Sequence, residues 1–346
     1  MIDNTTPETL DTQWIIRSLI HAYEKREPTR YVVDKYLAEG SLNILYGPPA
    51  AMKSMLLADL CACVVAGTDW LPGSANNGRG ISTSQGPVLW IDMDNGTRRT
   101  DERVEAVARA RSLPIDAPFY YVSMPMPTLD VGKLDMMIYL KTIIRQLDAR
   151  LTVIDNLGLI TGEIEENSAA MAMVMGYLRQ IAEGTKTAMV VIHHQRKGGA
   201  NGGRAGDALR GHSSIEAAVD LALHVMREPN SSDVSVRSTK TRGVDVQPVI
   251  AQFNYEHAAG TDDLARAWFS GMIPKRGDND IRDAILHVVD SYGQIAKTKL
   301  AQVVVESLGQ DAPGINKVRA WIDDMLANET GITEIQKGKY RLICLA

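Results

Sequence analysis

One short segment of the chain has the residue types that bind phosphate. It runs Gly47-Pro48-Pro49-Ala50-Ala51-Met52-Lys53-Ser54, after the apolar run Leu42–Tyr46 and before the helical pattern Met52–Ala66. A loop between a strand and a helix presents backbone N–H groups and the helix N-terminus to an anion. The Lys53 ammonium group would neutralise the phosphate charge, and the Ser54 hydroxyl would bind magnesium. The segment predicts a nucleotide site, with ATP and Mg²⁺ as its ligands.

This segment departs from the pattern G-x-x-x-x-G-K-[ST] at one position. Met52 stands where the pattern has glycine, and a side chain there restricts the torsion angles of the loop. The alternative interpretation is a proline-rich turn before a core helix. Because the segment lies between a strand and a helix, we favour the phosphate loop. Its nucleotide contacts would be Gly47, Pro48, Pro49, Ala50, Ala51, Met52, Lys53, Ser54 and Met55.

Two further apolar runs end in carboxylates. Leu151–Asp155 ends in an acid that would hold Mg²⁺ near the phosphates, provided that its strand ends at the same sheet edge. Val88–Met93 contains Asp92 and is followed by Asp94, and these two would share one face of a strand. Either carboxylate could act as a general base that activates water, and we choose Asp94 because it lies at the tip. For Asp155, a turn-forming role is the alternative.

A pair of histidines ends the apolar run Ala188–His193. Adjacent strand residues alternate faces, so one of His193 and His194 is expected to face the nucleotide and the other to pack; His194 is our candidate. A glycine-rich, basic stretch follows, which predicts a loop that tracks a nucleic-acid backbone. A solvated linker is the alternative. The DNA contacts of this loop would be Arg196, Lys197, Arg204 and Arg210.

Two cations follow the strand-like run Val234–Thr239. Lys240 and Arg242 flank one residue, so both side chains would project from the same edge. A pair of this kind could reach a γ-phosphate across a subunit boundary. An exposed basic turn is the alternative.

Strand-like and helical patterns alternate from Tyr31 to Tyr255, which predicts an α/β fold with a mostly parallel sheet. Ser214–Met226 continues this alternation as one element. We expect an N-terminal segment over residues 1–30 with an amphipathic helix pattern from Trp14 to Tyr23, and an ATPase domain over 31–274. Residues 275–280 are charged without an apolar residue and predict a linker. Three helical patterns and two strand-like segments over 281–346 have the order of a winged helix-turn-helix.

Composition restricts the possible classes of function. The formal net charge of −5 argues against a surface that coats nucleic acid everywhere, so any DNA contact must be local. The longest apolar stretch, Met55–Gly67, is interrupted by Asp59 and is shorter than a membrane span. The polar first residues lack the pattern of a secretory signal. We expect a cytoplasmic protein without a membrane segment.

Taken together, these motifs resemble the RepA-like hexameric helicase family of plasmids and phages. The order is the phosphate loop, Asp94, Asp155, Glu165-Glu166-Asn167-Ser168, His193-His194-x-x-Lys197-Gly198 and Arg210-Gly211-x-Ser213-Ser214. The segment Lys240-x-Arg242-Gly243 is similar to the arginine-finger motif of DnaB-type replicative helicases. The resemblance covers Tyr31 to Tyr255. It implies a RecA-like core, a ring with ATP at the subunit interfaces, and DNA in a channel lined by the loops after Asp155 and His194.

Two functions follow as alternatives. The first is a hexameric DNA helicase or translocase in plasmid, phage or mobile-element replication, acting on single-stranded or double-stranded DNA; the cations Lys240 and Arg242 favour it. The second is a non-motor ATPase, a DNA-bound regulator or helicase loader. Met52 and Asp94 favour the second, because relatives of the helicase type generally have glycine and glutamate there. Positive and negative charges nearly balance in the C-terminal segment, so its partner would be DNA or a replication or recombination protein.

Overall fold

The structure of the protein is a computed structural model. It describes residues 16–74, 78–162, 164, 170–194, 213–227, 229, 231–272, 278–308, 313–328, 331–337 and 340–345. The chain divides into two compact units, Met1–Ile273 and Pro274–Ala346.

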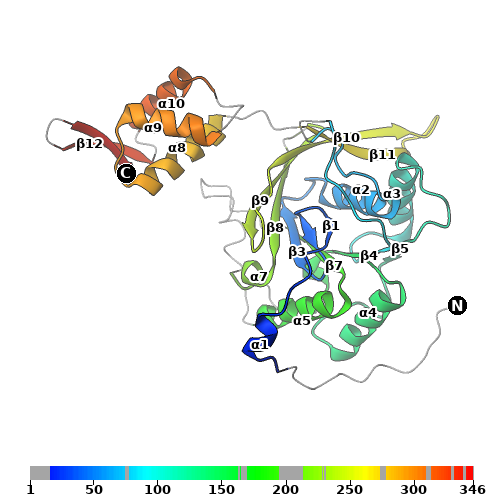
Figure 1. Cartoon of the computed structure of the whole chain (residues 1–346). Coiled ribbons are helices and arrows are strands. Elements are labelled where there is room, and N and C mark those ends of the chain that lie inside the picture. Colours follow the sequence, from blue (N-terminus) through cyan, green and yellow to red (C-terminus); the bar gives the residue numbers. More distant parts are fainter. Residues whose placement is uncertain are drawn as a thin grey trace. The chain divides into compact units, whose positions relative to one another are not determined.

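A nine-stranded sheet forms the centre of the larger unit, in the strand order β11-β10-β9-β8-β3-β7-β6-β4-β5 (Figure 1). The strands from β8 to β5 in this order are mutually parallel, whereas β9, β10 and β11 pair antiparallel. The predicted α/β fold with a mostly parallel sheet is confirmed. The strand bounds are β3 (Leu42–Gly47), β4 (Val88–Asp92), β5 (Phe119–Ser123), β6 (Leu151–Asp155), β7 (Ala188–His194), β8 (Leu221–Arg227), β9 (Asp233–Thr241), β10 (Val249–His257) and β11 (Leu264–Met272).

Helices cover both faces of this sheet. α2 (Lys53–Ala66) and α3 (Thr97–Ala110) lie on one face, and α4 (Leu134–Gln146) and α5 (Ala170–Thr185) lie on the other (Figure 1). The parallel strands β3, β4, β6 and β7 are buried almost throughout, which explains why they are continuous apolar runs. None of the helices within the described residues combines the length and apolar character needed to cross a bilayer. The short elements are α1 (Leu19–Ala22), β1 (Tyr31–Val33), β2 (Leu37–Ala38), η1 (Leu157–Leu159) and α7 (Ser213–Ala218).

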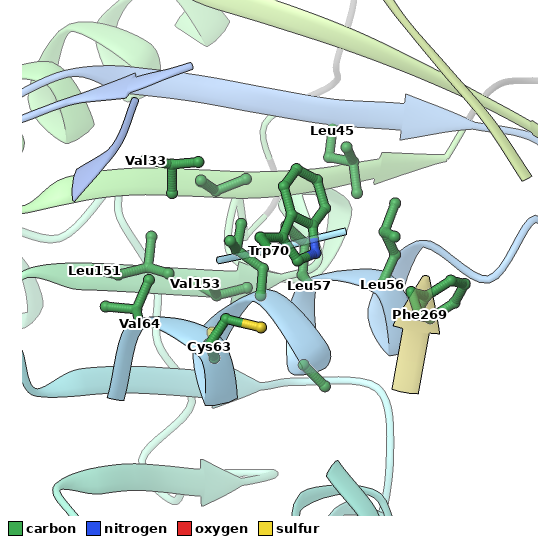
Figure 2. Close-up of a cluster of buried hydrophobic side chains, with 14 of the residues drawn as sticks. Val33, Leu45, Leu56, Leu57, Cys63, Val64, Trp70, Leu151, Val153 and Phe269 are labelled. Carbon is green, nitrogen blue, oxygen red and sulfur yellow. The ribbon is translucent and has the colours of Figure 1, made fainter. Parts of the chain in front are cut away.

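The antiparallel strands extend the sheet so that it also packs on α2 and α3. Phe269 of β11 belongs to the same buried cluster as Leu56 of α2 and Trp70 (Figure 2). A buried ion pair joins the same elements, because Arg111 donates to both carboxylate oxygens of Asp59, at 2.6 and 2.9 Å, and to the Phe269 carbonyl at 3.1 Å. The helix that begins at the phosphate loop is therefore fixed to α3 and β11 by both apolar and ionic contacts.

The N-terminal helix is shorter than the predicted pattern Trp14–Tyr23. α1 covers only Leu19–Ala22, and residues 1–15, which include Trp14, lie outside the described residues. The apolar side chains Leu19 and Ile20 are 72% and 74% exposed. Short helices draw most of their stability from the packing of an apolar face, and α1 has none within the described chain.

The segment Ser214–Met226, predicted as one element, contains two. α7 ends at Ala218, and β8 begins at Leu221. Between them, the Asp220 carboxylate accepts the N–H of Leu42 at 3.0 Å, which ties the chain to the start of β3. The apolar residues that follow then pair with both β3 and β9. Pairing with distant strands decides this structure, and a local pattern does not contain that information.

The smaller unit has three helices and a hairpin. These are α8 (Asp278–Tyr292), α9 (Lys297–Leu308), α10 (Ile315–Ala327), β12 (Ile332–Lys337) and β13 (Tyr340–Leu345), around a core that includes Ile285, Val304 and Ile343. α8 begins at Asp278, within the predicted linker 275–280, and residues 273–277 lie outside the described residues, so the linker stays a prediction. The winged-helix assignment itself stays a prediction.

Candidate nucleotide-binding site

The phosphate loop turns out of β3 immediately beside β8. A Cβ atom on Gly47 would lie 2.1 Å from the backbone carbonyl oxygen of Val225, so only glycine fits at the first loop position. Pro48 and Pro49 have no N–H group to offer a phosphate. The N–H groups at the start of α2 remain, and no described side chain caps that helix. An uncapped helix N-terminus at the end of a buried parallel strand is a place where anions bind.

Met52 adopts the backbone conformation that the usual glycine would have. Its φ is 63° and its ψ is 21°, in the left-handed region, and Ala50 also has a positive φ of 62°. For a residue with a Cβ atom this conformation costs roughly 1–2 kcal/mol. The Met52 side chain is half-buried against the core cluster of α2, which helps to hold the loop. The loop therefore keeps the expected geometry at an energetic cost.

This conformation predicts opposite outcomes for two replacements of Met52. Met52→Gly should leave ATP affinity within a few-fold of the wild type, because glycine adopts the left-handed region freely. Met52→Val should weaken ATP binding by roughly 10-fold, since β-branched residues strongly disfavour positive φ and the loop would rearrange. Isothermal titration with a non-hydrolysable ATP analogue measures both. Equal affinities for the two variants would contradict this account of the loop.

Lys53 is held by its own loop. The side chain is 4% exposed, and its ammonium group donates to the carbonyl oxygens of Gly47 at 3.0 Å and Pro48 at 2.9 Å. Burial lowers the pKa of Lys53 from 10.5 to about 8, and the nearby Asp155 opposes this shift. Within the described residues the hydrogen bonds of this buried cation go to neutral carbonyl groups, which favours a further anionic partner. Phosphate oxygens would take the place of the two carbonyls.

Ser54 and Asp155 form the second half of the site. The Ser54 hydroxyl hydrogen-bonds the Asp155 carboxylate, which is 1% exposed. Among the described residues, Oδ2 of Asp155 has no hydrogen-bond partner. The pKa of Asp155 is raised from 3.8 to about 6, mainly by burial; the hydrogen bond from Ser54 and the charge of Arg103 oppose this shift, and the charges of Asp92 and Asp94 add to it. A buried carboxylate oxygen without a donor, beside a serine hydroxyl, fits Mg²⁺, which prefers oxygen ligands. When bound there, Mg²⁺ would neutralise charge on the phosphates.

The raised pKa predicts that Asp155 destabilises the free protein at neutral pH. The folded state holds the Asp155 proton more tightly than the unfolded state does. The free energy of unfolding therefore falls as pH rises from 3.8 towards about 6, and it stays lower above that pH. Asp155→Asn should therefore stabilise the free protein at pH 7.5, by up to ~3 kcal/mol, which corresponds to up to ~10 °C in Tm. At pH 4 the difference should nearly disappear.

Thermal melts at the two pH values measure this effect. Asp94→Asn is the matched control, because Asp94 is an exposed carboxylate next to the same site and should change Tm little. Mg²⁺ with ATP should raise the Tm of the wild type but not that of Asp155→Asn. An Asp155→Asn protein that melts below the wild type at pH 7.5 would contradict the assignment of a buried, unpartnered carboxylate.

Asp92 and Asp94 have different roles, contrary to the expectation that they share one strand face. β4 ends at Asp92, so the alternation of faces does not continue to Asp94. The Asp92 carboxylate is fully buried and accepts the N–H groups of Asp94 at 3.1 Å and Asn95 at 2.9 Å. It also accepts the Thr100 hydroxyl at 3.0 Å. Asp92 therefore anchors the loop, while Asp94 is exposed and accessible to water.

Two arginines near the site were missed at the level of sequence. Nη1 of Arg103 on α3 lies 3.6 Å from Oδ2 of Asp92, and the Arg103 charge also opposes the raised pKa of Asp155. Nη1 of Arg227, at the carboxyl end of β8, lies 3.5 Å from the Ala50 carbonyl oxygen. The sequence contains a signal for each of these arginines. Arg103 follows the buried Thr100 by three residues, so both lie on the same helix face, and Arg227 is the last residue of a buried strand.

His194 lies next to the phosphate loop. In the parallel pairing of β3 with β7, His194 is the register partner of Gly47, and His193 is the partner of Tyr46. His194 is exposed, whereas His193 is 3% exposed. The chain continues into residues 195–212, which lie outside the described residues together with 165–169. These ranges contain the four predicted DNA contacts, Arg196, Lys197, Arg204 and Arg210, and the motif Glu165-Glu166-Asn167-Ser168.

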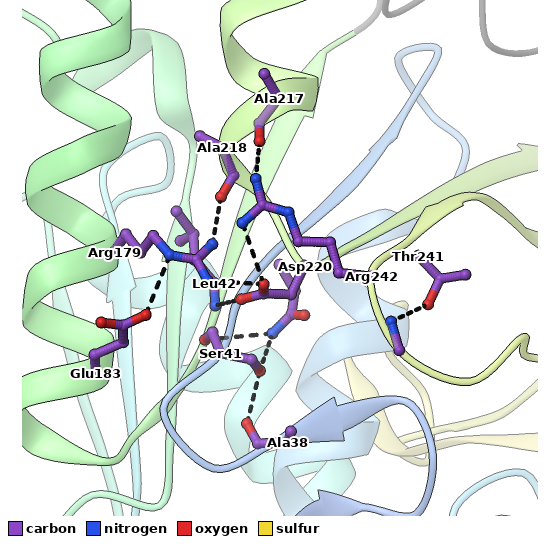
Figure 3. A network of polar contacts seen from close by, with 12 residues as sticks. Ala38, Ser41, Leu42, Arg179, Glu183, Ala217, Ala218, Asp220, Thr241 and Arg242 are labelled. Carbon is purple, nitrogen blue, oxygen red and sulfur yellow. Dashed lines mark hydrogen bonds and ion pairs between the residues drawn. The ribbon is translucent and has the colours of Figure 1, made fainter. Parts of the chain in front are cut away.

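Lys240 and Arg242 belong to a network of polar contacts that lies towards the amino end of β3, and Figure 3 shows Arg242 in it with Asp220 and Ala217. Arg242 donates to the Ala217 carbonyl, and its Nη1 lies 3.6 Å from Oδ1 of Asp220. Lys240 donates to the Glu216 carbonyl. Asp220 also binds the N–H of Leu42, the first residue of β3, whereas the phosphate loop follows the last residue of that strand. The structure therefore does not bring these cations to Lys53 of the same chain.

The strand, loop and helix around Lys53, with Ser54 of α2 in contact with Asp155 at the carboxyl end of β6, define a P-loop nucleotide-binding site. Residues 7–200 match the AAA_25 family model, described as an AAA domain, and the match covers more than half of the chain. The protein belongs to this family of P-loop ATPases, which includes RepA-like and DnaB-like replicative ATPases. The matched range contains Lys53, Asp94, Asp155 and His194.

Proposed function

We propose that this P-loop ATPase is a ring-forming DNA helicase or translocase that acts in plasmid, phage or mobile-element replication. The observation that supports it best is the separation of Arg242 from its own phosphate loop. The loop follows the carboxyl end of β3, and the Asp220 network that holds Arg242 lies at the amino end of that strand. A cation in this place serves a nucleotide site only in another copy of the chain, which requires a head-to-tail assembly.

Each candidate residue has a role in this proposal. Lys53 exchanges its two carbonyl partners for phosphate oxygens, and Ser54 and Asp155 hold Mg²⁺. The exposed Asp94 orients or deprotonates the attacking water, while Asp92 and Arg103 fix the loop that carries it. His194 lies in register with Gly47, where it can sense the γ-phosphate. Arg242 of the neighbouring copy, with Lys240 beside it, stabilises charge on the transferred phosphoryl group.

DNA would be bound by the basic stretch after His194, in line with the clustering of cations there. The position of this basic stretch along the chain supports a coupling between DNA binding and ATP binding. The stretch begins next to the phosphate loop at His194 and ends at α7, whose carbonyl groups accept hydrogen bonds from Lys240 and Arg242. A movement of this stretch would therefore reach both the nucleotide edge of its own chain and the cations directed at the neighbour.

Salt dependence tests the DNA contacts. Replacement of four cations by alanine should weaken binding to single-stranded DNA and flatten its salt dependence by about 0.7 in log–log slope per lost phosphate contact. The four are Arg196, Lys197, Arg204 and Arg210. Fluorescence anisotropy at several salt concentrations measures the slope. The matched control neutralises four exposed cations elsewhere: Lys25, Arg26, Lys133 and Arg145. An unchanged slope in the test variant would place the DNA elsewhere.

A non-motor ATPase that regulates or loads a helicase is the second candidate. It is favoured by Met52, which holds the loop in a costly conformation, and by the short side chain of Asp94 at the position of the general base. In this version the smaller unit, proposed to be a winged helix, binds DNA or a replication protein. ATPase rates with and without single-stranded DNA, together with particle mass, separate the two. A motor should be stimulated by DNA and assemble into rings; a regulator should bind DNA without stimulated turnover.

A further inference from the structure

The carboxylate of Asp220, just before β8, is shared by two arginines (Figure 3). Nη2 of Arg179 on α5 lies 3.0 Å from Oδ1 of Asp220, and Nη1 of Arg242 lies 3.6 Å from the same oxygen. The other oxygen, Oδ2, accepts the N–H of Leu42 at 3.0 Å. At these distances Arg179 donates a hydrogen bond, whereas Arg242 is within the range of an ion pair and not of a hydrogen bond. The charge of Asp220 is therefore compensated first by Arg179.

The backbone of Arg242 is held more firmly than its side chain. The N–H of Arg242 donates to the Asp220 carbonyl at 2.8 Å, and the N–H of Asp220 donates to the Leu42 carbonyl at 2.7 Å, which fixes the starting point of the side chain. The guanidinium group contacts the Ala217 carbonyl and, at the longer distance, Asp220, and the side chain stays partly exposed. The side chain can therefore change partners while the backbone keeps its place.

Arg179 is fixed by contacts that do not involve Arg242. Its Nη1 donates to the Ala218 carbonyl at 2.8 Å, and its Nε lies 3.2 Å from the Glu183 carboxylate one helical turn further along α5. A partly buried carboxylate without a cation is unfavourable, so a lone Asp220 would oppose the departure of Arg242. Because Arg179 remains bonded to Oδ1 of Asp220, the departure of Arg242 leaves no uncompensated charge behind.

We propose that Arg179 is a positioning residue for ATP hydrolysis, which compensates the charge of Asp220 so that Arg242 is available to the nucleotide of the neighbouring copy. This inference rests on the proposed function, in which Arg242 acts on a neighbour. Without Arg179, the Arg242 guanidinium group would move from 3.6 Å to hydrogen-bond distance of Oδ1 of Asp220. The finger would then be retained in its own chain, and hydrolysis in the neighbour would slow.

Steady-state ATPase kinetics test this role. Arg179→Gln should lower kcat by ~3–5-fold, which corresponds to the strength of a partly exposed ion pair. KM should change by less than about 2-fold, because the lost interaction acts on the finger and not on bound ATP. Arg179→Lys keeps the charge beside Asp220 and should hydrolyse ATP at nearly the wild-type rate. Arg109→Gln is the matched control, since Arg109 also pairs with a glutamate four residues away on its helix, and its kcat should equal that of the wild type.

A second substitution distinguishes positioning from a merely structural role. Asp220→Asn added to Arg179→Gln should restore kcat to within ~2-fold of the wild type, because the charge that retains Arg242 is gone. A structural role predicts that this double variant, which has lost two members of the network, is at least as slow as Arg179→Gln, and that result would overturn the proposal. Should Arg179→Gln not fold, Asp220→Asn alone decides: a rate at or above the wild type supports the proposal, and a lower rate overturns it.

Arg242→Ala separates this inference from the proposed function. Wild-type hydrolysis in Arg242→Ala would remove the finger and, with it, the role of Arg179. If Arg242→Ala is slow while Arg179→Gln keeps the wild-type kcat, the finger stands and only the role of Arg179 is wrong. When Arg179→Gln is added to Arg242→Ala, the rate should fall no further, because the residue through which Arg179 acts is already absent. An additional several-fold loss in that double variant would overturn the proposal.

Discussion

Replacement of Lys53 by alanine is expected to lower the rate of ATP hydrolysis by at least ~10²-fold, because a preorganised donor to the transferred phosphoryl group is lost. ATP binding should weaken as well, since the loop would face a polyphosphate without its compensating charge. The fold should survive, because the hydrogen bonds of this ammonium group within the described residues go to two carbonyl oxygens of its own loop. A coupled ATPase assay and a nucleotide titration measure the two effects.

Lys133→Ala is the matched control, because it removes an exposed lysine from the same unit. It should hydrolyse ATP at the wild-type rate. Undiminished turnover in Lys53→Ala would remove the assignment of the phosphate loop, and with it the roles given to Ser54 and Asp155. A loss of Tm comparable to that of a core mutation would instead show that Lys53 mainly supports the loop.

Arg242→Ala is expected to bind ATP nearly normally and to hydrolyse it ~10³-fold more slowly or worse, the effect of removing an arginine finger. The residue lies at the end of the strands remote from its own phosphate loop, and its side chain is 43% exposed although it contacts Asp220 and Ala217. A neighbour's nucleotide would have to replace those contacts. Arg145→Ala, at an exposed arginine of α4, is the control and should retain activity.

A mixing experiment separates action on the neighbour from action within one chain. Lys53→Ala spoils its own site, whereas Arg242→Ala spoils the site of the next copy. In a mixed ring, an intact Lys53 can face an Arg242 from the Lys53→Ala chain, and that site is complete. Activity should therefore return when the two inactive proteins are combined. If subunits exchange and no activity returns at any ratio, Arg242 does not act on a neighbour, and the basic-turn interpretation stands.

The sequence was sufficient where a residue's role depends on its immediate neighbours. The buried strands β3, β4, β6 and β7 are continuous apolar runs, and the loop at Lys53 follows one of them. The contact between Ser54 and Asp155 followed from the rule that parallel strands end at one edge. The strand-loop-helix context also outweighed the missing glycine, because Met52 adopts the conformation of that glycine.

The sequence was insufficient where distant pairing decides. β8 was merged with α7, and β11 was not predicted, since both depend on partners far along the chain. The sequence pattern placed Asp92 and Asp94 on one face of a strand and allowed either as the general base. The structure shows that the Asp92 carboxylate accepts hydrogen bonds from the N–H groups of the loop that follows it. Arg103 reaches the site from the middle of α3, at a position that no short motif contains.

The ion pair between Asp59 and Arg111 has a mechanical consequence. Asp59 lies on α2, and Arg111 is the C-cap residue of α3. The Arg111 guanidinium group also donates a hydrogen bond to the Phe269 carbonyl of β11. Breaking a buried ion pair costs several kcal/mol. We therefore expect α2, α3 and β11 to move together as one rigid body. A displacement of α2 by ATP at its first turn would then be carried through Arg111 to α3 and β11. If ATP binding displaces α2, we expect α3 and β11 to rotate with it, without sliding of α2 along the sheet.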